Sequence, residues 1–569
     1  MDDRVVPAAG KTATATRVRA AWVALALGLL FAALSLSPEY VAGRGPYWSA
    51  PLGDVAKGEI GWFYYARDAW RFPLFDTASY HQPEGAGVVL SDSLPLVALP
   101  AKAIYKLAYS PADTPPIYSG WWVALCLVLQ AVFASRLLRV LGIRDFVAHV
   151  AGIVIFCYLP IVMLRFGMAS LMAQFLILFA IEGYVRAKHE GLTRGEWILQ
   201  CALAPLTLLV HPYLAAMCGI VVAATILDQW REHRIAFAGV AARFASIAVA
   251  ALLVMFVGGF FAAAAGDFGD YGLYSLNLLS PLLPFPTTMS GTLLGITDYA
   301  SIPGTNQWEG GAYLGAGVLL LCALALPALR HWRANARRHA VLLALLIATL
   351  IFAVSNWIGI GKTEIAHVPL PDFLMHALSQ FRGSGRFVWI AVYALVAALL
   401  VAVVSRYGVR RARWILVIAA VLEIVDVWPM QTGVRAASAS PMPSTIDRAA
   451  WAKLIDAHAR IFVFPSFECG GLFGRDVPGT KFRELEIDWI AAMRNKPINS
   501  AYLARFTKNC ERERADAVAN FAEPGTLRLY RSTDEIGEWL IQRGADLARC
   551  GYLDDVVVCS ADSDLSHLR

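Results

Sequence analysis

The chain has 569 residues, of which 58% are hydrophobic and 16% are charged, and its formal net charge is +6. A soluble globular domain carries about 25% charged residues, so this composition excludes an ordinary soluble protein and indicates a polytopic membrane protein. The positive charge lies mostly in arginines of short loops between apolar segments, and no nucleic-acid-binding motif is present. We therefore expect no nucleic-acid partner.

Apolar segments long enough to cross a bilayer, roughly 17 to 25 residues each, follow one another up to residue 428. The block 197–230 is too long for one span and is interrupted by Pro205 and by His211-Pro212, so it predicts two short spans. The sequence thus predicts about 11 transmembrane helices, near residues 20–36, 117–135, 146–164, 169–185, 197–230 (two), 243–264, 311–329, 339–355, 386–404 and 412–428.

Basic residues mark alternate loops, and Lys and Arg in short loops stay on the cytoplasmic side. Both flanks of the block 197–230 are basic, which independently supports two spans there, whereas residues 265–310 contain no Lys or Arg. The pattern predicts a cytoplasmic tail over 1–19, a membrane domain over 20–428 with a large outer loop at 37–116, and an outer domain over 429–569. The first span reads as a retained anchor, so we expect a multi-pass protein of the bacterial inner membrane with a periplasmic C-terminal domain.

The segment 429–569 alternates strand-like and helix-like runs and predicts a small α/β domain. It contains no dinucleotide fingerprint, phosphate-binding loop or nucleophile elbow, so a structural or acceptor-recognition role is favoured. Four cysteines in it would face an oxidising compartment, which favours disulfides over free buried thiols. Three pairings are possible for Cys469, Cys510, Cys550 and Cys559. We predict that Cys550 pairs with Cys559, because a short loop joins them.

Carboxylates of the first outer loop and basic residues at the outer ends of later spans would form an acidic and a cationic pole. This pairing suits a reaction with an anionic leaving group, because a carboxylate can deprotonate an acceptor hydroxyl while arginine neutralises a departing phosphate. The acidic candidates are Asp54, Glu59 and Asp92, and the candidates for binding a donor phosphate are Arg165, His211, Lys362, Arg382 and Arg386.

Three stretches carry a resemblance to a known superfamily: LGDVAKGEIGWFYYARDAWRFP from Leu52, NQWEGGAYLGAG from Asn306 and FRGSGRFVW from Phe381. With the span number, the large first outer loop and the outer C-terminal domain, they resemble a bacterial branch of the GT-C glycosyltransferases. The resemblance covers nearly the whole chain. It implies transfer of a sugar from a polyprenyl-phosphate or diphosphate carrier to an acceptor hydroxyl of a glycan or glycolipid in the cell envelope.

The resemblance makes Asp54 the candidate catalytic base and Asp92 the alternative. In the superfamily the first loop often carries two acidic residues one apart, but here Glu59 lies five positions beyond Asp54, so a ready-made metal-binding pair is not implied. Each acid also has a structural interpretation. Asp54 and Asp92 could cap helices, and Glu59 is best explained as a solvated surface charge.

The cationic candidates have structural alternatives as well. Arg165 could reach lipid headgroups, and Arg382 and Arg386, four residues apart around two glycines, could anchor a helix at the interface instead of binding phosphate in a bidentate manner. His211 could contact phosphate, move a proton or be a satisfied interior histidine. Glu309 could bind an acceptor or a metal, or simply complement a helix start.

The sequence also allows a bound metal ion and two alternative functions. Asp54, Asp92 and Glu309 together could offer oxygen ligands to Mg²⁺ or Mn²⁺, and no His/Cys cluster suggests zinc. The alternative function is a transporter or flippase of lipid-linked saccharides, although no internal repeat supports it. An acyltransferase would need a His-based site, for which His81 and His211 are weak candidates.

Overall fold

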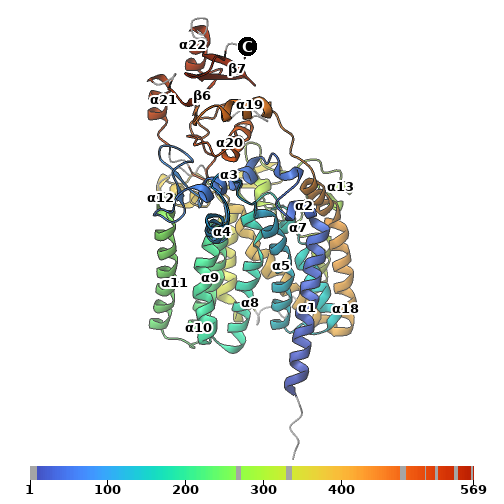
Figure 1. Ribbon diagram of the computed structural model, residues 1–569. Coiled ribbons are helices and arrows are strands. Elements are labelled where there is room, and N and C mark those ends of the chain that lie inside the picture. The colour runs from blue at the N-terminus through green and yellow to red at the C-terminus, as the bar shows by residue number, and fades with distance from the viewer. Residues whose placement is uncertain are drawn as a thin grey trace, which may run out of the picture.

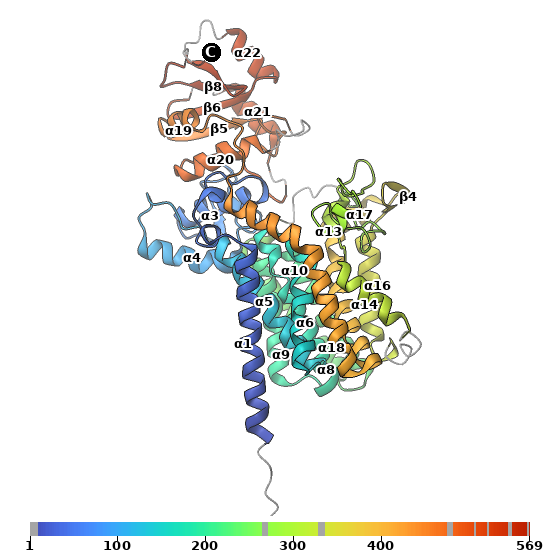
Figure 2. The ribbon, with the colours of Figure 1, turned by 90° about the vertical axis from the view of Figure 1, so that its right-hand side faces the viewer.

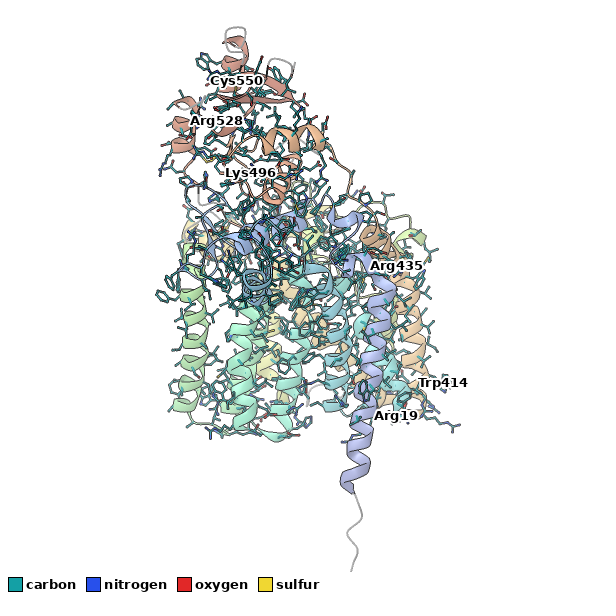
Figure 3. All side chains as sticks on the ribbon, viewed as in Figure 1. Arg19, Trp414, Arg435, Lys496, Arg528 and Cys550 are labelled. Carbon is teal, nitrogen blue, oxygen red and sulfur yellow. A yellow bond between two sulfur atoms is a disulfide. The ribbon has the colours of Figure 1, made fainter. Side chains whose placement is uncertain are left out.

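The computed structural model describes residues 9–263, 271–327, 336–474, 482–505, 508–519, 523–543, 549–565 and residue 568. Three layers follow along one axis: a helix bundle, a layer of short elements over one end of the bundle, and a C-terminal domain on top of that layer (Figure 1). Arg19 and Trp414 lie toward the far end of the bundle, and Arg435 lies near the short elements (Figure 3). The predicted basic loop after the span 311–329 lies partly outside the described residues.

The bundle contains ten helices as the structure describes it, and one of them is broken. They are α1 (Ala9–Ser35), α5 (Ser119–Val140), α6 (Phe146–Cys157), α8 (Phe175–Glu190), α9 (Arg194–Val210), α10 (Pro212–Arg231), α11 (Phe237–Gly258), α14 (Ala316–Ala325), α16 (Ala340–Val354) and α18 (Val388–Ala439). Gly408 breaks α18 with a φ of 70°, a backbone conformation that glycine adopts without steric cost. Helix α18 then continues past the predicted domain boundary at 429.

Among the described residues, six helical segments are long and apolar enough to cross a membrane: Val18–Ser35, Ser119–Val140, Ala169–Glu190, Pro212–Arg231, Phe237–Gly258 and Ser384–Ala439. Shorter apolar helices cover Phe146–Cys157, Ala316–Ala325 and Ala340–Val354. Apolar helices suit a bilayer because each satisfies its own backbone hydrogen bonds. The chain is therefore compatible with a multi-pass helical membrane protein, and the number 11 stays a prediction.

The predicted block 197–230 forms two helices, as expected. A capping box of Thr193 and Glu196 starts α9, and His211 both ends α9 and starts α10. Pro212 occupies the first turn of α10, where its missing N–H costs nothing. The break at His211-Pro212 lies at the end of the bundle that the short elements cover, so the imidazole stands at that surface.

The layer of short elements comes mainly from the first loop. It contains α2 (Pro38–Val41), η1 (Pro46–Trp48), α3 (Gly53–Arg67), β1 (Asp76–Thr77), β2 (Ala86–Gly87) and α4 (Pro95–Ala108). In Figure 2, α4 lies across the direction of α1. Later segments add α7 (Pro160–Met163), η2 (Ala169–Met172), α12 (Phe260–Ala263), α13 (Met289–Leu293), η3 (Gln307–Gly310), β3 (Trp357–Ile360), β4 (Thr363–His367), α17 (Asp372–Ser379) and η5 (Ser384–Phe387).

The C-terminal domain has a four-stranded sheet in the order β5-β6-β8-β7, which confirms a small α/β domain. Only β5 and β6 are parallel. Its elements are α19 (Arg448–Asp456), β5 (Arg460–Phe464), α20 (Arg483–Met493), α21 (Cys510–Ala519), β6 (Thr526–Arg531), α22 (Glu535–Arg543), β7 (Cys550–Leu553) and β8 (Val556–Ser560).

Disulfides join Cys469 to Cys510 and Cys550 to Cys559. The second joins directly opposite residues of β7 and β8, so the predicted pairing is confirmed.

The C-terminal domain packs against the first loop through α20 and α3. The hydroxyl of Tyr64 donates a 2.6 Å hydrogen bond to the carbonyl of Lys496, and Arg67 donates to the carbonyl oxygens of Ala492 and Met493. Because these contacts hold the outward side of α3, they fix which of its side chains face the bundle.

Candidate functional site

A cavity of about 560 Å³ lies where the bundle, the first loop and the C-terminal domain meet. The structure brings together in its lining seven of the residues that the sequence singled out as site candidates. They are Asp54, Glu59, Asp92, His211, Glu309, Arg382 and Arg386. Lys362 does not belong to the cavity, because it lies exposed in the turn between β3 and β4.

The centre of the acidic pole is a lysine that sequence reasoning did not single out. Lys57 is 4% exposed, and its Nζ forms an ion pair with Asp92 and lies 3.7 Å from Oδ1 of Asp54. Burial alone would raise the pKa of Asp92, but the charges on Lys57 and Arg386 outweigh it and lower that pKa below its usual value. The signal was present in the sequence, because Lys57 follows Asp54 by three residues, one helical turn.

Neither aspartate caps a helix. Helix α3 starts at Gly53, with Leu52 as its N-cap residue, so Asp54 is already in the first turn. Helix α4 follows Leu94, and no side chain caps it. Asp92 has a φ of 58°, in the left-handed region that non-glycine residues seldom adopt. Helix capping is therefore wrong as the explanation of both residues, and both side chains remain 28% exposed in the cavity.

His211 faces Asp92 across the cavity. Its Nδ1 accepts a 3.1 Å hydrogen bond from the backbone N–H of Tyr213, so the neutral imidazole carries its proton on Nε2. That Nε2 lies 3.7 Å from Oδ1 of Asp92. The arrangement gives Asp92 two basic neighbours, Lys57 and His211, from two different parts of the chain.

Two of the candidate phosphate-binding arginines bind Glu309 instead. Nη1 of Arg165 donates to Oε2 of Glu309 at 2.6 Å, and Nη2 of Arg386 donates to the same oxygen at 2.8 Å. Burial alone would raise the pKa of Glu309, but the two arginines lower it to about 2. Arg165 is 1% exposed, so the interpretation as a lipid-facing anchor is wrong. This ion-pair group joins η3, η5 and the segment after α7.

Arg382 remains available as a cation of the lining. Its guanidinium lies 5.9 Å from the ring centre of Tyr274, and it makes no ion pair with any carboxylate in the part of the chain that the structure describes. Two glycines, Gly383 and Gly385, separate it from Arg386. The backbone of Gly385 packs so closely on Gly310 and Ser275 that a Cβ would lie 2.5 Å from the Cα of Gly310. Glycine at this position therefore lets the backbone pack closely against Gly310 and Ser275. This packing allows Arg382 and Arg386 to take different orientations.

Glu59 is buried, so its interpretation as a solvated surface charge is wrong. It is 2% exposed, lines the cavity and accepts a hydrogen bond from the hydroxyl of Ser119. Burial raises its pKa to about 7, although the Ser119 hydrogen bond opposes this shift. The sequence could not reveal the burial, because Ser119 and the surrounding rings belong to later segments.

The C-terminal domain supplies one wall of the cavity, which sequence reasoning did not foresee. Tyr502, Ala504 and Arg505 lie in its lining. The ring of Tyr502 lies 5.2 Å from Nζ of Lys57, and Nη1 of Arg505 donates a 3.1 Å hydrogen bond to Oε1 of Gln380. The domain thus contacts Lys57 in the acidic pole and the segment that carries Arg382.

The residues present do not fit the suggested Mg²⁺ or Mn²⁺ site. Nζ of Lys57 already occupies the space between Asp54 and Asp92, and two arginines neutralise Glu309. Within the described ranges, no three His, Cys, Asp or Glu side chains gather as metal ligands would. We therefore assign no chemical step to a metal.

Family comparison agrees with the division of the chain into a bundle and a C-terminal domain. No curated protein matches the sequence. A family model described as "Domain of unknown function (DUF6311)" matches residues 25–428, which include most of the bundle and the first loop. A second model, "DUF6311 C-terminal domain", matches residues 450–561. The chain therefore belongs to the DUF6311 family.

Proposed function

We propose that this protein is a membrane glycosyltransferase of the GT-C type, which moves a sugar from a polyprenyl-phosphate or diphosphate carrier to an acceptor hydroxyl. The observation that carries the proposal is the cavity beside the bundle, whose lining holds the carboxylates of Asp54 and Asp92 together with the guanidinium of Arg382. A reaction that deprotonates a hydroxyl and releases a phosphate needs both groups within one substrate length.

The apolar part of the lining supports a lipid-linked donor. Leu208 and Ala216, beside the α9–α10 junction, face the cavity together with Met255 and Phe260 near the end of α11. Most of α11 is exposed along its length, so this side of the bundle would border lipid. A polyprenyl chain would enter here, between α9, α10 and α11, and place its phosphate near the charged residues.

In the proposed reaction, the acceptor hydroxyl gives its proton to the carboxylate of Asp54. The acceptor oxygen forms a bond to the anomeric carbon, and the bond between that carbon and the phosphate oxygen breaks, leaving its electron pair on the phosphate. Lys57 and Arg382 neutralise the departing polyprenyl phosphate. Asp92 orients Lys57 and is less suited as the base, because its pKa is lowered and its carboxylate is bound to that lysine.

Arg165, Arg386 and Glu309 have a positioning role in this proposal. The ion-pair group ties the segment after α7 to η3 and η5. Arg382, which precedes η5, is thereby held at a fixed place in the lining. Lys362 has no role in it.

The same proposal includes 11 transmembrane helices, a cytoplasmic N-terminus and a periplasmic C-terminal domain in the bacterial inner membrane. Two features support this orientation. Arg19 lies at the end of the bundle away from the C-terminal domain, in agreement with the positive-inside rule (Figure 3). Both disulfides lie in the C-terminal domain, and disulfides persist in oxidising compartments.

The test uses the full chain in lipid nanodiscs with radiolabelled polyprenyl-phosphate sugars and a mixture of envelope glycolipid acceptors. Asp54→Asn is expected to lower transfer by about 100-fold or more, the typical range for loss of a general base. Asp298→Asn is the matched control, because Asp298 is exposed and lies outside the cavity. Transfer by Asp54→Asn at the wild-type rate would overturn the role of Asp54. In a second assay in sealed proteoliposomes, movement of labelled lipid across the bilayer without transfer would favour a flippase.

A further inference from the structure

One arm of the cavity is lined by aromatic rings around a buried carboxylate. The rings of Tyr40 and Trp48 stack with their centres 4.9 Å apart and their planes at 24°, and Phe166 lies 5.2 Å from Tyr40. Glu59 and Ser119 complete this part of the lining. We name these five residues the aromatic pocket.

Glu59 has unused hydrogen-bonding capacity in this pocket. Its Oε1 accepts the hydrogen bond from Ser119, whereas its buried Oε2 has no partner among the residues that the structure describes. A buried polar atom without a partner costs free energy unless a ligand or water supplies the missing hydrogen bond. The reaction proposed above does not use this carboxyl group.

The rings contribute apolar surface to the cavity lining. The indole N–H of Trp48 is already occupied, because it donates a 3.0 Å hydrogen bond to the carbonyl of Tyr40. A pocket that combines aromatic faces with one polar group suits a ligand with an apolar face and hydroxyls at its edge. A sugar ring has both, since its axial C–H bonds form an apolar face and its hydroxyls point outward.

The position of Glu59 relative to the proposed base agrees with such a ligand. Both residues belong to α3 and are five positions apart, which corresponds to about 7.5 Å along the helix axis. The two side chains also lie about 140° apart around the axis, but both line the cavity, so a donor that extends along this side of α3 can contact Glu59 with its sugar and reach Asp54 with its anomeric carbon. Lys57 lies between them on the same helix, where the donor phosphate is expected.

We propose that the aromatic pocket binds the sugar ring of the donor, with Oε2 of Glu59 forming a hydrogen bond to a ring hydroxyl. This inference rests on the proposed function. Glu59 is a specificity residue in it, and it makes no bond to a reacting atom.

The test compares two probes on the full chain in nanodiscs: polyprenyl phosphate, and polyprenyl phosphate bearing glucose, mannose or arabinose. We expect Glu59→Gln to weaken binding of at least one sugar-bearing probe by tenfold or more, while binding of the bare lipid changes less than twofold. Retained binding of the bare lipid shows that the variant is folded. Glu39→Gln, an exposed glutamate of α2, is the matched control and should change neither.

The outcomes separate the two proposals. If the wild type binds bare polyprenyl phosphate but Glu59→Gln affects both probes equally, or neither, the sugar pocket is wrong and the proposed function stands. If the wild type prefers no sugar-bearing probe over the bare lipid, the pocket is also wrong. If the wild type binds no polyprenyl phosphate at all, the proposed function fails, and the pocket assignment fails with it.

Discussion

Arg505 of the C-terminal domain donates a 3.1 Å hydrogen bond to the side-chain oxygen of Gln380, two residues before Arg382. Both arginines line the cavity. The contact joins the domain to the segment that carries an available cation of the site, so changes in the domain should reach the chemistry.

We expect Arg505→Ala to lower sugar transfer by roughly tenfold, because it removes the charged hydrogen bonds of Arg505 to Gln380. The thermal stability of the bundle should change little, because α20 and α3 still hold the domain. Transfer assays and melting curves on the same preparation check this. Arg514→Ala, at an exposed ion pair with Glu535 in the same domain, should retain full activity, and equal loss in both variants would contradict a specific role.

Lys57→Met should abolish binding of polyprenyl phosphate and lower transfer by about 100-fold or more, because it removes the cation between two carboxylates. Asp92 would then lose the charge that lowers its pKa, so the pKa of Asp92 should rise. Lys57→Arg should restore part of the binding. Lys453→Met on the exposed face of α19 is the control, and unchanged lipid binding in Lys57→Met would exclude Lys57 from the phosphate site.

Glu309→Gln should destabilise the protein by about 3–5 kcal/mol, because it leaves the buried guanidinium of Arg165 and the charge of Arg386 without their carboxylate. Denaturant unfolding in detergent, followed by tryptophan fluorescence, measures the change. Glu190→Gln, at the exposed end of α8, should be nearly neutral. A neutral Glu309→Gln would mean that the ion-pair group does not hold these segments together.

Glu59 should make the protein less stable as the pH rises from about 4.5 to 7. In this range the unfolded carboxyl group has lost its proton, whereas the folded one, with a pKa of about 7 caused by burial, keeps it. The folded state then binds more protons, so the free energy of unfolding falls with pH, by about 1.4 kcal/mol per pH unit. Above pH 7 both states are ionised and this contribution is constant.

Glu59→Gln should remove this part of the pH dependence. Unfolding free energies of the wild type and the variant at pH 5, 6, 7 and 8 give the comparison, and the advantage of the variant should grow between pH 5 and 7. Parallel curves would show that Glu59 titrates normally in the folded protein.

The local features of the fold could be predicted from the sequence, because each depends on a short stretch of chain. The break at His211-Pro212 and the strand around Arg460–Phe464 both depend on neighbouring residues alone. We also expected the first loop to meet the ends of later helices, since charge position along the chain indicates which loops share a side of the membrane, and both contribute to the cavity lining.

The pairing of charges within the site could not be predicted. Glu309 was assigned to an acceptor or a metal, and Arg165 to a phosphate, yet they bind each other across 144 positions of the sequence. Glu59 and Lys57 belong to the same helix, but their burial depends on Ser119 and Tyr502, which lie in later segments. Tertiary packing decides which charged side chains pair and which are buried, and the periodicity along a single helix does not reveal that packing.

The wall formed by Tyr502 and Arg505 has a consequence for how the protein is made. Domains fold largely in the order of their synthesis, so the helices of the bundle can assemble before residues 502–505 have left the ribosome. During that interval Tyr502 and Arg505 cannot yet cover the charged residues around Lys57. The site is therefore complete only after synthesis has continued well into the C-terminal domain.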